Sequence, residues 1–411
     1  MKRNCIIGQS GGPTIAINAS LAGIIHRAKS SKEFNHVYGM INGIKGLLDG
    51  QYMDLLEEFD NGEKINALKQ TPAMYLGSCR FKLPTHQDNI QVYEDLFKIL
   101  TDLEITDFFY IGGNDSMDTV MKLDEYARHI QSPIHFIGIP KTIDNDLMGT
   151  DHTPGFGSAA KYVATSILEV VHDSLIYQLQ SVTIIEIMGR NAGWLTAAAA
   201  LARNEYNEAP DLIYLPEVVF DKDKFLQDIH EVFKKKRCVV IAVSEGIKDK
   251  DGHFLDDDSK YAKKDAFGHV LHSGTGKMLE SLVFKEFGCK VRSIELNVLQ
   301  RCAMHIGSKT DLNESFVVGQ KAIETALEGK SGQVMGFKRL CNDPYHIDYI
   351  SSDVRDIANL EQKIPRNWIN EAGNDINQEL YDYLYPLIQG EVHIQYKNGI
   401  PAYYSCKHLQ K

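Results

Sequence analysis

Short apolar runs with strand character alternate with helix-like segments along most of this 411-residue chain. The strand-like runs are expected at 5–8, 36–41, 107–111, 134–139, 181–187, 211–214, 238–243 and 290–296. Helical patterns fill many of the gaps, for instance 91–103, 159–171 and 223–236. Strands that alternate with helices form parallel sheets covered by helices on both faces. Because one hydrophobic core rarely serves a chain of this length, we predict an α/β protein with two domains.

The run 134–139 leads into the segment Pro140–Leu147, which reads Pro-Lys-Thr-Ile-Asp-Asn-Asp-Leu. Ligands of α/β proteins bind at the carboxyl ends of strands, so this segment is a candidate catalytic loop. Asp144 and Asp146 can accept a proton or orient a metal, and Lys141 can meet an anion. For this motif alone, an Asp- and Asn-rich turn that caps a helix is the alternative.

Two glycine-rich loops, 8–13 and 112–116, each follow a strand-like run and precede a helical pattern. Paired glycines let backbone N–H groups approach a phosphate, and a helix N-terminus favours negative charge there. Asp115 places a carboxylate in the second loop, which suits a bridging Mg²⁺ or the exclusion of one particular phosphate. Neither loop carries the dinucleotide fingerprint or the Walker sequence, which argues against a dehydrogenase and a P-loop NTPase.

An ordered set of short motifs resembles the phosphofructokinase family, and more closely its pyrophosphate-dependent branch. The motifs are Gly11-Gly12, Gly112-Gly113-Asn114-Asp115-Ser116, Pro140–Asp146, Met188-Gly189-Arg190, Ser244-Glu245-Gly246 and Gln300-Arg301. Taken singly, each motif is more simply interpreted as a turn or a surface arginine. Together, in the family's order, the motifs span most of the chain. The resemblance implies reversible phosphoryl transfer from pyrophosphate to the 1-hydroxyl of fructose 6-phosphate, with Mg²⁺, in glycolysis or gluconeogenesis.

The branch rests on Asp115 and Lys141, where ATP-dependent members of the family have glycine. A glycine leaves room for the nucleotide's α-phosphate, whereas the Asp115 carboxylate fills that volume and repels the charge. Lys141 offers a cation to a small, highly charged donor, and phosphoryl transfer depends mostly on positioning and electrostatic stabilisation. The resemblance also implies that Gly11, Gly12 and Arg80 lie near the donor phosphates.

The remaining roles are likewise implied by the resemblance, residue by residue. Asp144 matches the base that takes the proton from the attacking hydroxyl, Thr142 and Ile143 match contacts in the same turn, and Asp146 matches a carboxylate near the metal. Sugar-phosphate contacts are implied at Met188, Gly189, Arg190, Glu245, Arg292 and Arg301, and Arg190 also matches a group that steadies the transferring phosphoryl. A planar arginine suits a phosphate dianion because it binds two oxygens at once.

Three positions depart from the family pattern. Asn114 stands where the metal loop usually has Asp; its carbonyl oxygen can bind Mg²⁺ but supplies no charge. Val298 replaces a frequent His or Tyr, and Ser181 stands where many relatives contribute an arginine across a subunit boundary. These departures leave open another ketose phosphate, such as sedoheptulose 7-phosphate, as the acceptor. The alternatives are an ATP-dependent 6-phosphofructokinase, a non-catalytic sugar-phosphate-binding subunit, and an NAD or lipid kinase.

The family pattern implies two Rossmann-like domains with the active site in the cleft between them. We assign residues 1–153 and about 300–345 to the pyrophosphate domain. Residues 154–299 and the C-terminal segment of about 346–411 are assigned to the sugar-phosphate domain. The charged, glycine-containing stretch 248–277 is expected to be a loop excursion.

The formal net charge of −11 argues against binding to nucleic acid or to an anionic membrane. No apolar run approaches membrane-spanning length, and we expect a cytoplasmic enzyme. Because the family builds its sugar-phosphate site at a subunit contact, a homodimer or homotetramer is expected.

Overall fold

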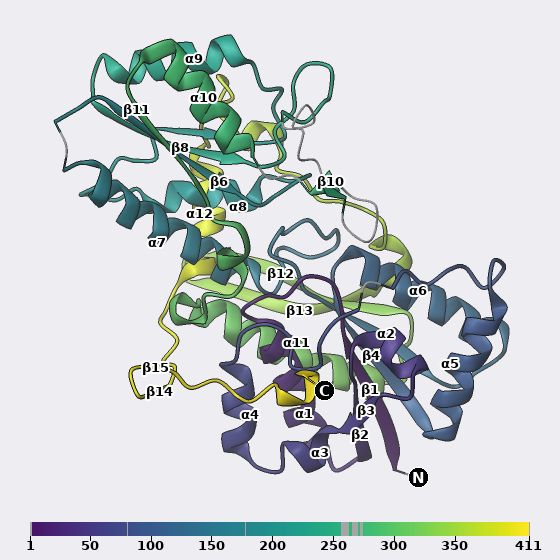
Figure 1. The fold of residues 1–411 in the computed structure, drawn as a ribbon. Helices are drawn as coiled ribbons and strands as arrows, with labels where there is room; N and C mark the ends of the chain where they lie inside the picture. Colours follow the sequence, from purple (N-terminus) through teal and green to yellow (C-terminus); the bar gives the residue numbers. More distant parts are fainter. Residues whose placement is uncertain are drawn as a thin grey trace.

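The computed structural model describes residues 2–79, 81–176, 178–255 and 274–410, together with the backbone of the short strands β9 (Lys263–Lys264) and β10 (Val270–Leu271). It has two lobes, each built around its own sheet (Figure 1). The stretch expected as a loop excursion, 248–277, falls largely outside the described residues.

The first lobe contains a seven-stranded sheet of order β13-β12-β5-β4-β1-β2-β3. Its strands are β1 (Arg3–Gln9), β2 (Phe34–Met40), β3 (Tyr52–Asp54), β4 (Ile105–Gly112), β5 (His135–Pro140), β12 (Gln333–Asn342) and β13 (Tyr345–Asp353). The central pairs are parallel, whereas the edge strands β3 and β13 run antiparallel to their neighbours. The sheet is therefore mixed, which corrects the expectation of a purely parallel one.

The second lobe contains a four-stranded sheet of order β11-β6-β8-β7, in which every pair is parallel. Its strands are β6 (Ser181–Ile187), β7 (Leu212–Tyr214), β8 (Cys238–Ser244) and β11 (Lys290–Glu295). The remaining short strands, β14 (Tyr396–Lys397) and β15 (Ile400–Pro401), form a hairpin near the C-terminus.

Helices cover both faces of the large sheet because its strands bury side chains on both sides. Cys5 and Ile7 of β1 face the core under α1 and α11, while Ile6 faces the core under α5 and α6. The α-helices are α1 (Ile17–Ser31), α2 (Gly43–Leu48), α3 (Leu55–Glu58), α4 (Gly62–Lys69), α5 (Ile90–Asp102), α6 (Asn114–His129), α7 (Phe156–Ser174), α8 (Trp194–Ala197), α9 (Lys222–Phe233), α10 (Thr275–Phe287), α11 (Lys309–Leu327) and α12 (Gln378–Leu384). The 3-10 helices are η1 (Ala198–Ala202), η2 (Asn297–Arg301), η3 (Met304–Ile306), η4 (Val354–Asp356), η5 (Arg366–Trp368), η6 (Tyr385–Ile388) and η7 (Lys407–Gln410).

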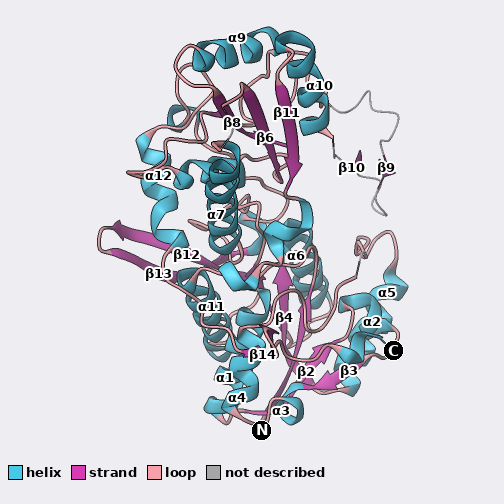
Figure 2. Ribbon diagram, turned by 60° about the vertical axis from the view of Figure 1, so that its left-hand side comes forward, coloured by secondary structure: helices cyan, strands magenta, loops and turns pink. Residues whose placement is uncertain are grey.

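Helix α7 lies between the two sheets (Figure 2). The predicted fold class of two Rossmann-like α/β domains is confirmed. The C-terminal segment differs from the expected assignment to the second domain alone. Strand β13 completes the sheet of the first lobe, and α12 packs into the core of the second. The chain then returns to the first lobe, where the Tyr404 hydroxyl donates to Glu58 at 2.8 Å. Hydrogen bonding in the sheet decides the position of β13, so the 346–411 assignment is corrected.

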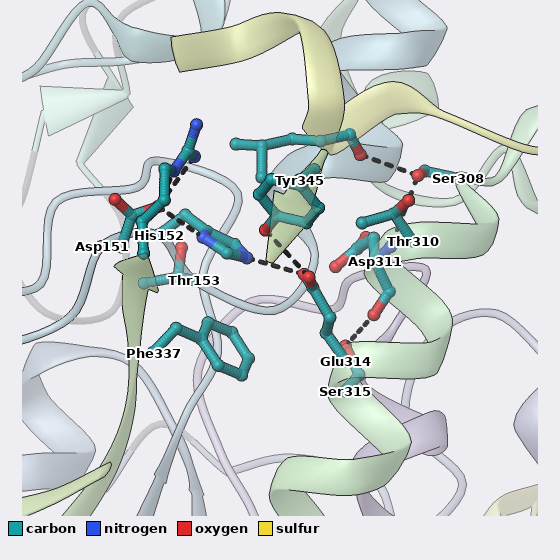
Figure 3. A network of polar contacts seen from close by, with 12 residues as sticks. Asp151, His152, Thr153, Ser308, Thr310, Asp311, Glu314, Ser315, Phe337 and Tyr345 are labelled. Carbon is teal, nitrogen blue, oxygen red and sulfur yellow. Dashed lines mark hydrogen bonds and ion pairs between the residues drawn. The ribbon is translucent and has the colours of Figure 1, made fainter. Parts of the chain in front are cut away.

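A buried network of charged groups joins the loop that follows the Pro140–Leu147 segment to the rest of the first lobe (Figure 3). The ring of His152 lies between two carboxylates, with Nδ1 2.8 Å from Asp151 and Nε2 2.8 Å from Glu314. Tyr345 donates to Glu314, and Arg339 binds Asp151. Burial by itself lowers the pKa of His152, but the carboxylates outweigh it and raise that pKa to about 9. His152 is therefore a buried cation at neutral pH.

Replacing His152 with leucine is expected to destabilise the fold by about 3–5 kcal/mol, because it leaves two buried carboxylates without their shared cation. The folded-state pKa lies above the usual 6.5, so the stabilisation is complete below pH 6.5 and disappears as the pH rises toward 9. Urea midpoints of both proteins between pH 6 and 9 provide the check. The difference between them should shrink as the pH rises, and a constant difference contradicts a charged His152.

Candidate active site

Three loops of the first lobe meet because they follow neighbouring strands β1, β4 and β5, whose carboxyl ends lie at one edge of the sheet. The Ser10 N–H donates to the Ile111 carbonyl at 2.9 Å, and the Lys141 N–H donates to the Gly112 carbonyl at 2.9 Å. The glycine-rich loops and the Pro140–Leu147 segment are thus adjacent, as their position after strands predicts.

Lys141 is almost completely buried at the centre of these loops. Its Nζ donates to the carbonyl of Gly12 at 2.6 Å. Burial lowers the pKa of Lys141 to about 7; the charge of Arg301 acts in the same direction, while Asp144 and Asp146 oppose it. With its pKa near neutrality, the ammonium form of Lys141 is stabilised further by any anion that binds beside it.

Two cations lie directly against the paired glycines. A Cβ at Gly11 would lie 3.1 Å from Nζ of Lys141, and one at Gly12 would lie 3.0 Å from Nη1 of Arg301. The backbone of Gly11 also has a φ of +78°, which L side chains rarely adopt. The loop therefore brings backbone groups and two cations close together, as a phosphate site requires.

Asp144 and Asp146 follow Lys141 in the same turn, and Asp144 lies within the field of all three site cations. Burial raises the pKa of Asp144, while Lys141, Arg301 and Arg190 hold it down. Burial, followed by repulsion from Asp144, raises the pKa of Asp146 to about 7. Two adjacent carboxylates with raised pKa values are ready to take up a proton or a cation.

The turn is fixed by hydrogen bonds from outside it. Asn145 has a φ of 56° in the left-handed region, which Asn tolerates better than most residues. Its side-chain nitrogen donates to the hydroxyl of Tyr383 at 2.8 Å, and its oxygen accepts from the Thr153 N–H at 2.9 Å. Thr142 places its hydroxyl 3.1 Å from the Asp144 N–H. These hydrogen bonds hold the backbone of the turn that carries Asp144.

The second lobe contributes the loops that follow β6 and β8. The Gly189 N–H donates to Glu245 at 3.3 Å, and the Met188 N–H donates to Gln300 at 3.4 Å. Burial is the main cause that raises the pKa of Glu245 to about 8, and Asp144 adds to it. Arg190 acts on both Glu245 and Asp144. Glu245 and Arg190 of the second lobe thus lie close enough to Asp144 of the first lobe to interact with it electrostatically.

Arg301 has an unused donor at this site. Its Nε is buried and has no hydrogen-bond partner among the described residues. Buried polar groups are almost always hydrogen-bonded, so a ligand oxygen is the natural acceptor. Because its Nη1 lies against Gly12, Arg301 contacts the first glycine-rich loop, and its charge also acts on Asp144.

Of the predicted residues, one lies away from this cluster, one falls outside the described residues, and one is exposed at the start of a helix. Arg292 pairs with Asp173 at 2.9 Å near the start of β11, opposite the carboxyl ends of the strands. Arg80 falls outside the described residues. Asp115 is exposed in the first turn of α6.

Asn114, predicted as a metal ligand, has both ends of its amide occupied by protein. Its oxygen accepts from the Asn359 N–H at 2.6 Å, and its nitrogen donates to the Leu360 carbonyl at 2.8 Å. The structure thus gives Asn114 a contact with the C-terminal segment that sequence reasoning missed. Within the described part of the chain, no three His, Cys, Asp or Glu side chains form a ready metal site. The neighbouring carboxylates of Asp144 and Asp146 nevertheless suit Mg²⁺, which binds through one or two carboxylates together with substrate phosphates.

A fold and a site of this kind define a phosphotransferase: cations, glycine loops and carboxylates meet at strand ends where phosphate groups bind. The family model described as Phosphofructokinase matches residues 4–325. The chain belongs to the phosphofructokinase family, as its ordered motifs predict.

Relatives extend this similarity over nearly the whole chain. A Halomonas elongata protein named Pyrophosphate--fructose 6-phosphate 1-phosphotransferase is 40% identical, with coverage of 97% of this chain and 95% of the relative. A Xanthomonas campestris protein of the same name is 39% identical and covers 99% and 96%. The crystal structure of a pyrophosphate-dependent phosphofructokinase from Nitrosospira multiformis has a TM-score of 0.88, with 37% identity and coverage of 98% and 96%.

In the described part of this chain, no helix is long and apolar enough to cross a membrane.

Proposed function

We propose that this protein transfers a phosphoryl group from pyrophosphate to the 1-hydroxyl of fructose 6-phosphate. The products are fructose 1,6-bisphosphate and phosphate, and the reaction runs in both directions. The observation that carries the proposal is the buried Lys141, held between the Gly12 loop and Asp144. The names of the relatives support it, since the match covers nearly the full length of each chain.

Asp144 is the proposed base. Its carboxylate accepts the proton of the 1-hydroxyl as that oxygen attacks the nearer phosphorus of pyrophosphate. The bond from this phosphorus to the bridging oxygen breaks, and the electron pair leaves with phosphate. Lys141, Arg190 and Arg301 are the groups proposed to stabilise the charge that develops on the transferring and leaving groups, and their effect on the pKa of Asp144 supports this role.

Asp144 and Asp146 are the residues proposed to hold Mg²⁺, which neutralises charge on the phosphates when bound. Asn114 stays a prediction as a ligand. Gly11 and Gly12 supply close backbone approach to the donor.

The sugar phosphate is proposed to bind at the second lobe, at Met188, Gly189, Arg190 and Glu245. The family resemblance places this site at a subunit contact, and we propose a homodimer or homotetramer. Arg292, half-exposed on the outer edge of its sheet, is available to serve a neighbouring subunit in such an assembly. The cytoplasm is the proposed location.

Initial rates with fructose 6-phosphate and Mg²⁺, with pyrophosphate or ATP as donor, test the proposed function. Turnover with pyrophosphate and little with ATP is expected. Preference for ATP contradicts the choice of donor. Absence of turnover with either donor, for fructose 6-phosphate and for sedoheptulose 7-phosphate as the acceptor, contradicts the whole proposal.

Replacing Asp115 with glycine is expected to raise kcat/KM for ATP by about tenfold or more, because a repulsion of about 1–4 kcal/mol is removed. Asp115→Asn is the matched control, since it removes the charge but keeps the volume. Rates with ATP and pyrophosphate, measured for both variants and the wild type, separate the two effects. Unchanged ATP use in Asp115→Gly shows that this carboxylate does not select the donor.

A further inference from the structure

A short segment beyond the family match, residues 359–364, crosses the site from one lobe to the other; we call it the 359–364 strap. Figure 1 shows the chain passing from the end of β13 beside α6 toward the upper lobe. At its start, Asn359 binds the N-terminal turn of α6, through its N–H to Asn114 at 2.6 Å and its side-chain nitrogen to Asp118 at 3.0 Å. Asn114 returns a hydrogen bond to Leu360.

The middle of the strap lies against the catalytic turn. Glu361 pairs antiparallel with Leu147, and the Gln362 N–H donates to the Asp146 carbonyl at 2.8 Å. These bonds attach the strap to the backbone that follows Asp144. The strap is therefore in contact with two of the loops that meet at the proposed site.

Beyond the turn, the strap reaches the loop that carries Arg190. Glu361 accepts from the side-chain nitrogen of Asn191 at 2.8 Å. The indole N–H of Trp194 donates to the Gln362 carbonyl at 2.9 Å. Glu361 thus binds the residue next to Arg190 while its own backbone is fixed to the catalytic turn.

We propose that the 359–364 strap positions the loops of the two lobes for the reaction, and that Glu361 is a positioning residue that orients the loop carrying Arg190 through its contact with Asn191. This inference rests on the proposed function. Phosphoryl transfer needs groups from both lobes within a fraction of an ångström, and a displacement of 1 Å can lower a rate by about 10²-fold. Glu361 connects the two lobes through its backbone pairing with Leu147 and its carboxylate contact with Asn191.

The strap also explains why Asn stands at position 114. An amide can accept from the Asn359 N–H and donate to the Leu360 carbonyl at the same time. An ionised Asp accepts only, and its second oxygen would face the Leu360 carbonyl. The departure from the family's metal loop thus serves the attachment of the strap.

The test compares Glu361→Ala, Glu361→Gln, Asn191→Ala and the double Ala variant with the wild type. Glu371→Ala is the matched control, because it removes the same side chain from an exposed position further along the C-terminal segment. For each protein, kcat and KM for fructose 6-phosphate and pyrophosphate and the melting temperature are measured. Activity of the wild type tests the proposed function first.

Glu361→Ala is expected to lower kcat/KM for the sugar phosphate by about tenfold, with kcat reduced and the melting temperature preserved. Glu361→Gln keeps the acceptor for Asn191 and should retain most of the activity. The double variant should be no worse than either single one, because the two residues act through one contact. A Glu361→Ala enzyme within about twofold of wild type, additive losses, or a loss shared with Glu371→Ala overturns the proposal while the wild-type activity stands.

Discussion

Replacing Asp144 with asparagine is expected to lower kcat by about 10²–10⁴-fold, the usual contribution of a general base. Asparagine fills the same volume and can still meet the Thr142 hydroxyl, but it accepts no proton from the sugar. Lys141, Arg301 and Arg190 oppose the rise in pKa that burial causes at Asp144, and they thereby favour its ionised form. Steady-state kinetics with pyrophosphate and fructose 6-phosphate give the measurement.

The affinity for the sugar phosphate, measured by calorimetry, and the melting temperature are the controls. Burial raises the pKa of Asp144, so its ionised form is less stable in the folded protein than in the unfolded chain at neutral pH. The neutral variant should therefore unfold no earlier than the wild type. Near-wild-type turnover in a folded Asp144→Asn enzyme shows that another group removes the proton.

Central strands were predictable because each is a continuous apolar run between polar segments. Strand β6 was expected at 181–187 and spans Ser181–Ile187. A strand buried on both faces carries this signal by itself. The edge strands lack it: β3 has three residues, and β13 is joined to β12 by a tight turn at Asp343-Pro344 rather than by a helix. Alternation of strands and helices therefore identified the fold class and missed the mixed sheet.

The site, like the fold, has one part that the sequence predicts and one part that it does not. Lys141, Asp144 and Asp146 share one loop after β5, so strand ends and motif spacing bring them together in advance. The antiparallel contact of Glu361 with Leu147 joins residues more than 200 positions apart, and no local pattern announces it. Arg292 shows a further limit, because motif order selects the residue, whereas the structure pairs it with Asp173 near the start of β11.

Replacing Lys141 with methionine is expected to lower kcat/KM for pyrophosphate by about 10²–10³-fold, comparable to the loss of one strong donor in other electrostatic sites. Methionine is close in length and carries no charge. Burial already lowers the pKa of Lys141 to about 7, so removing the ammonium should not destabilise the fold. Under the proposed function, bound phosphate groups would stabilise the charged form of the wild-type lysine, and this would link its charge to the reaction.

Ligand binding supplies the control for Lys141, because the equilibrium constant forces any variant to lose the same overall factor in the forward and the reverse reaction. If Lys141 acts on the donor and leaving phosphate, calorimetry should show fructose 6-phosphate binding preserved while pyrophosphate binding weakens. Equal loss of both ligands would assign Lys141 to the architecture of the loops, because its Nζ also holds the Gly12 carbonyl. Loss confined to the phosphate donor would place the cation in the transfer itself.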